Sequence, residues 1–482
     1  MNSQRINSTT LVSILASLSI PALLTFSFSQ ASAAAQDLQK VYLEKLSNNA
    51  PIEIVEDITS PRQSFILVFQ GGAGLVPKEQ QGITTVLSQM LGEGPKSMTG
   101  DAYRKQLFLL NSSISVSGSP RAMYVSVTAP VDNLKKVLSL AFEVIQNPKL
   151  DPETFSIAHG KVQTSANSIL DNMRGATYYF AFRDAFKFHP DVLDGSAAPG
   201  TIKSLSLETA KEWYPKLMDF QKMAVATVGP ATKWKVLADA QNFMAQTKKV
   251  VKKNTYIPTE FKGINPADYT PAEIAVALIN KPKATDNQIL YIFPESLQFD
   301  SKERLVSLVT HENLGGGLTG MLGDVLRTQR GLTYHASTRA DGQRPYWTVY
   351  TFGGIFQTQG LLAGVPEVIE KFKAQKIEAK DVELSKQMNR TFFRSGMELP
   401  EDRLFSRLRL KMYGLNPGFI DQFEDLLGKV TPEEVDQFRK AKLNTQKGFL
   451  YLMGDKSQIL PVLEKAGFKK DKVRVIELTE LI

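Results

Sequence analysis

The sequence contains no cysteine and only four histidines. Without cysteine the chain cannot form disulfide bonds, thiolate zinc ligands, a cysteine nucleophile or an N-terminal lipid anchor on cysteine. A folded protein of this length must then be held together by its hydrophobic core. No two histidines are three or four residues apart, as a helical pair of zinc ligands would be; the four are His159, His189, His311 and His335. We therefore expect no metal site within this chain.

Charge is nearly absent from the N-terminus, where Arg5 is the only charged residue among the first 36. An uncharged and largely apolar stretch covers 11–28, and small residues follow it with a cleavage site after Ala33 or Ala35. We interpret residues 1–35 as a secretory signal peptide and expect the mature protein to be exported, into the periplasm. The alternative is a transmembrane anchor. It is less favoured because the stretch contains serine, threonine and proline and is short for a span. No later run is long and apolar enough to cross a bilayer.

The net charge of +8 is spread along the chain, with basic and acidic residues interleaved. The densest basic cluster occupies 248–253, and we interpret it as part of a solvated linker between two domains. Because the charges do not gather into one patch, and because we expect export, we expect no nucleic-acid partner.

A faint repeat with a period of about 220 residues divides the mature chain into two halves. Each half runs from two strands through a helix, a hairpin and long helices to a final strand. In the first half we expect strands at 52–55 and 64–69, helices at 82–91, 132–145 and 152–182, a hairpin at 114–117 and 123–129, and a last strand at 223–229. In the second half we expect strands at 275–279 and 288–293, helices at 303–311, 361–372 and 379–399, a hairpin at 333–339 and 346–352, and a last strand at 448–454.

This order of elements lacks the strict alternation of strand and helix that a parallel sheet requires. It predicts an α+β fold with two tandem homologous α/β-sandwich domains, each a mixed or antiparallel sheet with helices on one face. We expect the first two strands of the first half to pair with each other. We place the N-terminal domain at 36–250 and the C-terminal domain at 256–482. Two sheets that face each other would leave a cleft for a ligand.

The order of elements and several local strings resemble the pitrilysin/insulinase family of zinc metallopeptidases, over essentially the whole mature chain. In catalytic members the first helix after the glycine-rich turn carries H-x-x-E-H, whose histidines bind zinc and whose glutamate deprotonates the metal-bound water. Here Thr85 and Gln89 stand in place of the histidines, and Ser88 in place of the glutamate. The family's distal glutamate ligand falls on Ala166. The resemblance therefore implies a degenerate zinc site and a chain that does not cleave peptides by itself.

The residue pattern of this helix can also be explained without a lost zinc site. Its apolar residues recur at helical spacing and predict one buried stripe, formed by Ile83, Val86, Leu87, Met90 and Leu91. Thr85 and Gln89 lie four residues apart on another face. On this interpretation the segment is an ordinary amphipathic core helix.

The second half keeps a different part of the family's signature. A glycine-rich start at 314–317 leads into a helix with Arg327, and then through Gly331 to Tyr334. In the family, the matching arginine and tyrosine bind the substrate carbonyl and stabilise the oxyanion, so the resemblance implies that role here. Simpler interpretations stay open: Arg327 at the C-terminal end of its helix dipole, Tyr334 as a half-buried strand residue, and Gly331 as a helix stop.

Two-chain bacterial members of the family divide this machinery between a chain with H-x-x-E-H and a chain with the arginine and tyrosine. The resemblance therefore implies a non-catalytic subunit of a heterodimeric zinc metallopeptidase, with Arg327 and Tyr334 acting in trans. We expect no cofactor in this chain and zinc in a homologous H-x-x-E-H partner. The alternative is a pseudopeptidase that acts as a peptide-binding or scaffold protein, with no role in hydrolysis.

Members of the family hold an extended peptide substrate as a strand added to a sheet edge. The matching strand in this sequence is 113–117, formed by Ser113, Ile114, Ser115, Val116 and Ser117. Backbone pairing needs no special side chain, so the same strand could equally be an ordinary sheet edge.

Overall fold

The structure is a computed structural model and describes residues 39–187, 189, 199–246, 255, 265, 268–295, 297–317, 320–340 and 346–478. The predicted signal peptide, 1–35, and most of the predicted linker and its basic cluster lie outside the described residues. Within the described ranges, no helix combines the length and the apolar character needed to cross a membrane. Two six-stranded sheets, one from each half, organise the fold.

The first sheet has the strand order β1-β2-β6-β3-β5-β4. Its strands are β1 (Gln39–Lys45), β2 (Pro51–Asp57), β3 (Gln63–Gln70), β4 (Ser113–Gly118), β5 (Ala122–Ala129) and β6 (Met223–Gly229). β6 runs parallel to β2 and antiparallel to β3, and the other pairs are antiparallel, so the sheet is mixed.

The second sheet repeats this arrangement in the order β12-β7-β11-β8-β10-β9. Its strands are β7 (Ile274–Asn280), β8 (Asp286–Pro294), β9 (Ala336–Ala340), β10 (Tyr346–Gly354), β11 (Gly448–Gly454) and β12 (Val473–Glu477). The edge differs between the halves, because β12 runs parallel to β7 whereas β1 runs antiparallel to β2. The predicted α+β fold with two tandem sheet-and-helix domains is confirmed.

The expected pairing of the first two strands in the first half is wrong. β6 lies between β2 and β3, and β11 lies between β7 and β8. All residues of β6 are buried, as befits a strand covered on both faces. Strands that follow each other in sequence often pair, and the local pattern contains no signal that a strand from the end of each half is inserted between them.

Helices of the same half cover one face of each sheet. On the first sheet the main ones are α2 (Ile83–Gly92), α4 (Leu134–Gln146), α5 (Pro152–Ser168), α9 (Leu207–Leu217) and α10 (Lys233–Ala245). On the second they are α11 (Lys302–Gly315), α13 (Thr358–Ala374), α14 (Ala379–Gly396), α16 (Phe419–Gly428), α17 (Pro432–Lys442) and α18 (Lys456–Lys465). Local chemistry sets their ends. Asp151, for example, caps α5 by accepting from the amide of Thr154, and Pro152 follows it.

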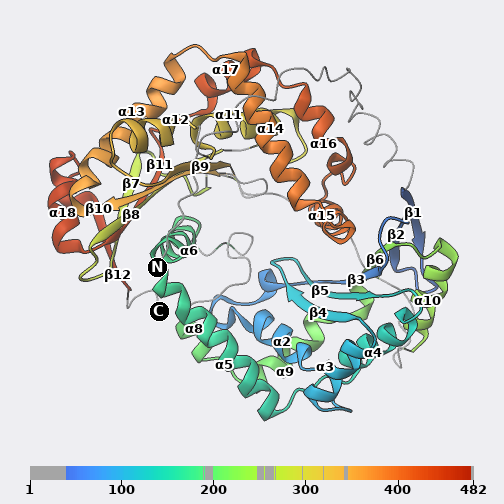
Figure 1. Ribbon diagram of the computed structural model, residues 1–482. Helices are drawn as coiled ribbons and strands as arrows, with labels where there is room; N and C mark the ends of the chain where they lie inside the picture. Colours follow the sequence, from blue (N-terminus) through green and yellow to red (C-terminus); the bar gives the residue numbers. More distant parts are fainter. Residues whose placement is uncertain are drawn as a thin grey trace, which may run out of the picture.

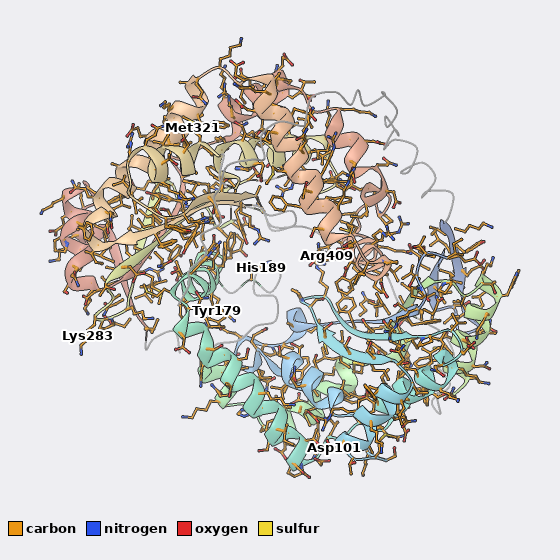
Figure 2. The ribbon with its side chains drawn as sticks, viewed as in Figure 1. Asp101, Tyr179, His189, Lys283, Met321 and Arg409 are labelled. Carbon is orange, nitrogen blue, oxygen red and sulfur yellow. The ribbon has the colours of Figure 1, made fainter. Side chains whose placement is uncertain are left out.

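The other face of each sheet is covered by a helix from the opposite half (Figure 1). The helical stretch predicted at 152–182 breaks at Asn172, which caps a new helix, α6 (Met173–Ala185). This helix leaves the first half and packs on β8 and β11. In return, α15 (Pro400–Met412) packs on β6. Tyr179 and Arg409 mark the two exchanged helices in Figure 2. The prediction that helices cover one face of each sheet holds for the helices of the same half. It did not include the helix from the opposite half that covers the other face.

Candidate functional site

Helix α2 begins after Gly82, whose left-handed φ of +94° suits glycine. The apolar stripe of the helix is buried in the first core, as its periodicity predicts. Ser88 is 7% exposed, and its hydroxyl donates to the carbonyl oxygen of Thr84 at 2.8 Å. Ser88 is therefore a buried hydroxyl satisfied within its own helix. Thr85 and Gln89 lie on the exposed face.

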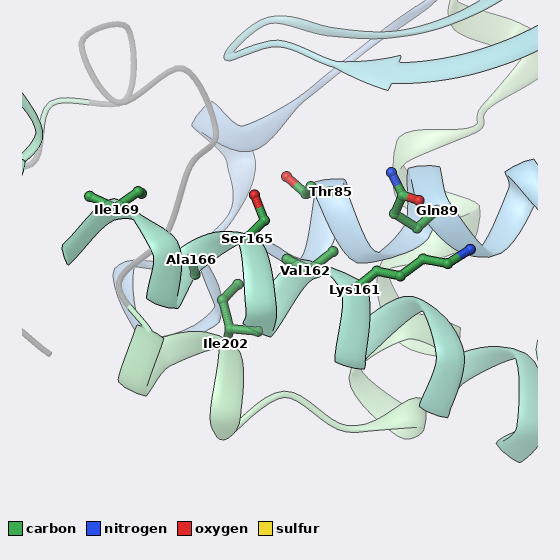
Figure 3. Close-up of a pocket in the computed structure, with 8 residues that line it drawn as sticks. All are labelled: Thr85, Gln89, Lys161, Val162, Ser165, Ala166, Ile169 and Ile202. Carbon is green, nitrogen blue, oxygen red and sulfur yellow. The ribbon is translucent and has the colours of Figure 1, made fainter. Parts of the chain in front are cut away.

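Thr85, Gln89 and Ala166 lie around one pocket of about 200 Å³. Figure 3 shows this pocket between α2, α5 and the short helix α8 (Pro199–Lys203). Its lining consists of Thr85, Gln89, Lys161, Val162, Ser165, Ala166, Ile169 and Ile202. All of these belong to the first half. The three positions that the resemblance assigns to zinc ligands are thus neighbours in space, although Ala166 is far from the other two in sequence.

The donor chemistry of the pocket does not fit zinc. A threonine hydroxyl, a glutamine amide and an alanine methyl stand where imidazoles and a carboxylate are needed. Across the part of the chain that the structure describes, no three side chains of histidine, aspartate or glutamate are grouped so that they could hold a metal ion. His159 on α5 is engaged elsewhere, because its Nε2 lies 2.8 Å from the carbonyl oxygen of Ile202.

The charged residue on the pocket rim is Lys161, whose charge is balanced by Glu93. The Lys161 Nζ lies 2.6 Å from Glu93 Oε1, and Arg104 Nη1 lies 2.9 Å from Oε2. The hydrogen bond from Lys161, together with that from Arg104 and against the effect of burial, holds the pKa of Glu93 below its usual value. Among its described lining residues, the pocket therefore presents no charge without a counter-charge.

Strand β4 forms one edge of the first sheet beside α2. It pairs with β5 on one side, and the described sheet ends there. Ile114 and Val116 pack against the first core, whereas the serines face solvent: Ser113, Ser115 and Ser117. A Cβ at Gly118 would lie 3.3 Å from the Cβ of Thr84, so the strand passes close to the helix. The strand has neither proline nor a charged residue, the features that commonly block pairing at an edge.

Arg327 and Tyr334 contact each other in the second half. Arg327 lies in a π-helical segment, η6 (Asp324–Gln329), which continues the short helix α12 (Met321–Gly323). Its guanidinium carbon is 4.7 Å from the centroid of the Tyr334 ring. Gly331 has a φ of +62°, and its amide donates to the carbonyl oxygen of Arg327 at 3.1 Å. The helix stop predicted at Gly331 is confirmed.

The alternative placement of Tyr334 as a half-buried strand residue is wrong. Tyr334 is 74% exposed and precedes β9. A cation over an exposed aromatic ring is worth about 0.5–1 kcal/mol. The contact therefore holds the two side chains beside each other while most of Tyr334 stays exposed.

The sequence interpretation gave no role in this half to two further residues, His335 and Arg174. Burial, followed by the positive charges of Arg174 and Arg327, lowers the pKa of His335 and favours a neutral imidazole. The His335 Nε2 lies 3.0 Å from the Ser337 hydroxyl. Arg174 belongs to α6, and its guanidinium carbon is 4.5 Å from the centroid of the Tyr350 ring. No sequence signal places Arg174 here, because it arrives through the exchange of helices between the halves.

Comparisons with known proteins are consistent with this architecture. Two family models match the chain: "Insulinase (Peptidase family M16)" over residues 52–190 and "Peptidase M16 inactive domain" over residues 204–389. A curated relative, the "Non-peptidase homolog YmxG" of Helicobacter pylori, is 21% identical over 412 residues, which cover 82% of this chain and 90% of the relative.

Solved structures show the same fold. A peptidase M16 inactive domain from Pseudomonas fluorescens has a TM-score of 0.72 at 17% identity, covering 86% of this chain and 98% of that one. A protease from Helicobacter pylori has a TM-score of 0.72 at 16% identity, covering 86% of this chain and 100% of that one. The two family models together cover more than half of the chain and show that it belongs to the insulinase (peptidase M16) family.

Proposed function

We propose that this chain is the non-catalytic subunit of a heterodimeric zinc metallopeptidase and supplies Arg327 and Tyr334 in trans to the zinc site of a homologous partner. The observation that carries the proposal is the 4.7 Å contact between these two side chains, with Tyr334 74% exposed. The first half has threonine, glutamine and alanine at the positions of the zinc ligands, so hydrolysis would require zinc from the partner.

The pair has the donors that peptide hydrolysis needs. When water attacks a peptide bond, negative charge develops on the carbonyl oxygen, and preorganised donors lower the barrier. The Tyr334 hydroxyl would donate to that oxygen, and the Arg327 guanidinium would hold the carbonyl and balance the charge. The partner's H-x-x-E-H motif would supply the metal and the general base.

Peptide binding is the second part of the proposal. An extended substrate would pair with the free edge of β4 through main-chain hydrogen bonds. Support comes from the exposed alternate serines and the absence of charge along this strand. Ser113, Ile114, Ser115, Val116 and Ser117 would then contribute backbone donors and acceptors.

The competing proposal is a pseudopeptidase that binds peptides or acts as a scaffold. The match to a family model named for an inactive domain, and a relative named as a non-peptidase homologue, are compatible with it. A pure scaffold, however, has no need for an arginine and an exposed tyrosine held together beside a helix stop. For either function we propose export to the periplasm, on the signal-like N-terminus; N-terminal sequencing of the mature protein would test this.

Reconstitution tests the proposal. The chain is mixed with an exported H-x-x-E-H homologue from the same organism, and cleavage of a quenched fluorescent peptide library is followed with zinc present. We expect no cleavage by this chain alone and cleavage by the mixture. Arg327→Ala and Tyr334→Phe should each lower the rate of the mixture by roughly 100-fold, as expected for loss of an oxyanion donor, while co-elution of the two chains is retained.

Arg330→Ala provides the matched control, because Arg330 lies three residues along and pairs instead with Glu367. Its mixture should keep the full rate. Full activity of both Arg327→Ala and Tyr334→Phe would rule out the role in trans and favour the scaffold.

A further inference from the structure

We propose that the pocket between α2, α5 and α8 receives one apolar side chain of an extended peptide paired with β4, and so sets the sequence preference of the chain. This inference rests on the peptide binding of the proposed function and gives a new use to the positions that resemble zinc ligands. It names the preferred substrate as an uncharged segment with a leucine-like or phenylalanine-like residue at one position.

The pocket has an apolar floor and a polar rim, and the charge of Lys161 on this rim is balanced by Glu93. Val162, Ala166 and Ile202 form the floor and are 8%, 7% and 1% exposed. Thr85 and Gln89 stand on the rim and are exposed. Such a lining favours an apolar group whose flanking backbone stays near polar atoms. A charged group would lose its hydration on the floor without gaining a counter-charge.

The volume suits one side chain. The pocket measures about 200 Å³, below the roughly 300–1,000 Å³ typical of sites for drug-sized ligands. A cavity of about 150 Å³ already accepts a benzene molecule. Leucine and phenylalanine therefore fit this pocket, whereas a larger organic cofactor does not.

The position of the pocket relative to β4 would let a side chain of the paired peptide enter it directly. Ile114 and Val116 point to the face of the sheet that packs on the first core, to which α2 belongs. Side chains alternate along a strand, so a peptide added beside β4 would direct every second side chain to that same face. Figure 3 shows Thr85 and Gln89 extending from α2 toward the side where the β4–β5 hairpin runs. A side chain on this face of the added strand would meet the pocket.

A series of fluorescein-labelled peptides tests the inference with the full mature chain. The probes are seven-residue amides of alternating threonine and serine, with fluorescein on the N-terminal amine and leucine, phenylalanine, alanine or aspartate in the centre, and binding is measured by fluorescence anisotropy. The leucine and phenylalanine peptides should bind at least about tenfold more tightly than the alanine and aspartate peptides, because only they bury apolar surface on the floor.

A rim variant links the preference to the pocket. Thr85→Phe places a ring over the opening from an exposed helical position, so it should remove the preference while the alanine peptide binds as before. Thr391→Phe is the matched control, since Thr391 is an exposed threonine in the middle of α14. It should leave the preference intact.

Because the chain has no cysteine, a single introduced thiol gives a second readout. A peptide with a central cysteine, activated as a mixed disulfide with 2-thiopyridine, should couple to Thr85→Cys much faster than to Thr391→Cys. The protein thiolate attacks the peptide sulfur, and 2-thiopyridine leaves.

The outcomes separate the two claims. If all four central residues bind equally well and Thr85→Phe changes nothing, the pocket has no role and peptide pairing with β4 still stands. If none of the peptides binds, both the pocket and the pairing with β4 are excluded, whereas the role of Arg327 and Tyr334 is still decided by reconstitution.

Discussion

The guanidinium Nε of Arg407, on α15, lies 3.1 Å from the carboxylate Oε1 of Glu53, on β2, although the two residues are 354 positions apart in sequence. Glu53 is 2% exposed. Lys411, one turn further along α15, also approaches this carboxylate, with its Nζ 3.6 Å away. A buried charge on the sheet of the first half is thus balanced by a helix of the second half, which ties the two halves together.

Replacing Arg407 with methionine should therefore destabilise the whole chain. The substitution keeps much of the side-chain volume but, among the residues that the structure describes, leaves the more distant Lys411 as the ion-pair partner of Glu53. Removing one partner of a buried ion pair costs about 3–5 kcal/mol, and Lys411 should reduce this to about 2–3 kcal/mol. Urea denaturation, followed by circular dichroism, measures the change. Arg394→Met is the control, since its pair with Glu424 is exposed and should be worth less than about 1 kcal/mol. Equal losses in both variants would contradict the argument.

The exchange of helices also predicts where a core substitution in α6 will be felt. Phe180 is 1% exposed and packs among residues of the second sheet, including Ile279 and Leu290. Phe180→Ala should cost about 3–5 kcal/mol, and amide exchange should speed up in β8 and β11. Phe243→Ala, a similar change within the first core, should instead expose the first sheet. If Phe180→Ala loosened only the strands of the first half, the helix exchange would not be the source of its effect.

Much of the fold followed from periodicity and turn chemistry. The closing strands predicted at 223–229 and 448–454 have the bounds of β6 and β11, but the second half continues to a further strand, β12, which was not predicted. What the sequence could not supply was long-range placement. The buried residues of α6 show that one face of the helix is covered, but an apolar face does not specify which sheet covers it.

For the candidate site, too, some features could be predicted from the sequence and others could not. Thr85, Gln89 and Ala166, which the resemblance singled out, lie around one pocket. The apolar floor was not foreseen, since Ile202 comes from a separate helix, α8. Likewise, Arg174 and Arg327 both act on the pKa of His335, and Arg174 comes near His335 through the exchanged helix. Contacts that arise from tertiary packing cannot be predicted from the spacing of residues within one segment.

A buried carboxylate in the second half predicts a dependence of stability on pH. Glu295 lies at the end of β8, is 9% exposed, and accepts hydrogen bonds from Ser307 and His311 at 3.0 and 3.1 Å. Burial opposes its ionisation, but the bonds from His311 and Ser307 and the charge of Arg304 prevail and hold its pKa below the usual value. A carboxyl whose pKa is lower in the folded state adds stability above its unfolded pKa, about 4.3, and loses that contribution as the pH falls.

Glu295→Gln should therefore be about 3 kcal/mol less stable than the parent at pH 7, where the carboxylate partners are lost. The difference should shrink as the pH falls below about 4.3, because the unfolded parent then takes up a proton that the folded state resists. Urea midpoints at pH 7, 5 and 3.5 measure this convergence. Glu367→Gln, on the exposed pair with Arg330, should change little at any pH. A difference that stays constant across this range would mean that the charge of Glu295 contributes nothing to stability.

Two glycines with open space around them should respond in opposite directions to the same substitution. Gly331 has a φ of +62°, and Gly160 lies inside helix α5; a Cβ added at either would meet no atom within 4 Å. Gly160→Ala should stabilise the chain by about 0.5–1 kcal/mol, because alanine loses less entropy in a helix. Gly331→Ala should cost about 1–2 kcal/mol, because the left-handed region is strained for alanine.

The second substitution also tests how Tyr334 is positioned. Gly331 turns the chain from η6 toward Tyr334, so strain there should disturb the contact with Arg327 and lower the rate of the reconstituted peptidase. Gly331→Asn should recover most of the stability and the rate, since asparagine tolerates left-handed backbone. If Gly331→Ala and Gly331→Asn behaved alike in both measurements, the turn would not require a left-handed residue, and the side chains of Arg327 and Tyr334 would have to be oriented by other contacts.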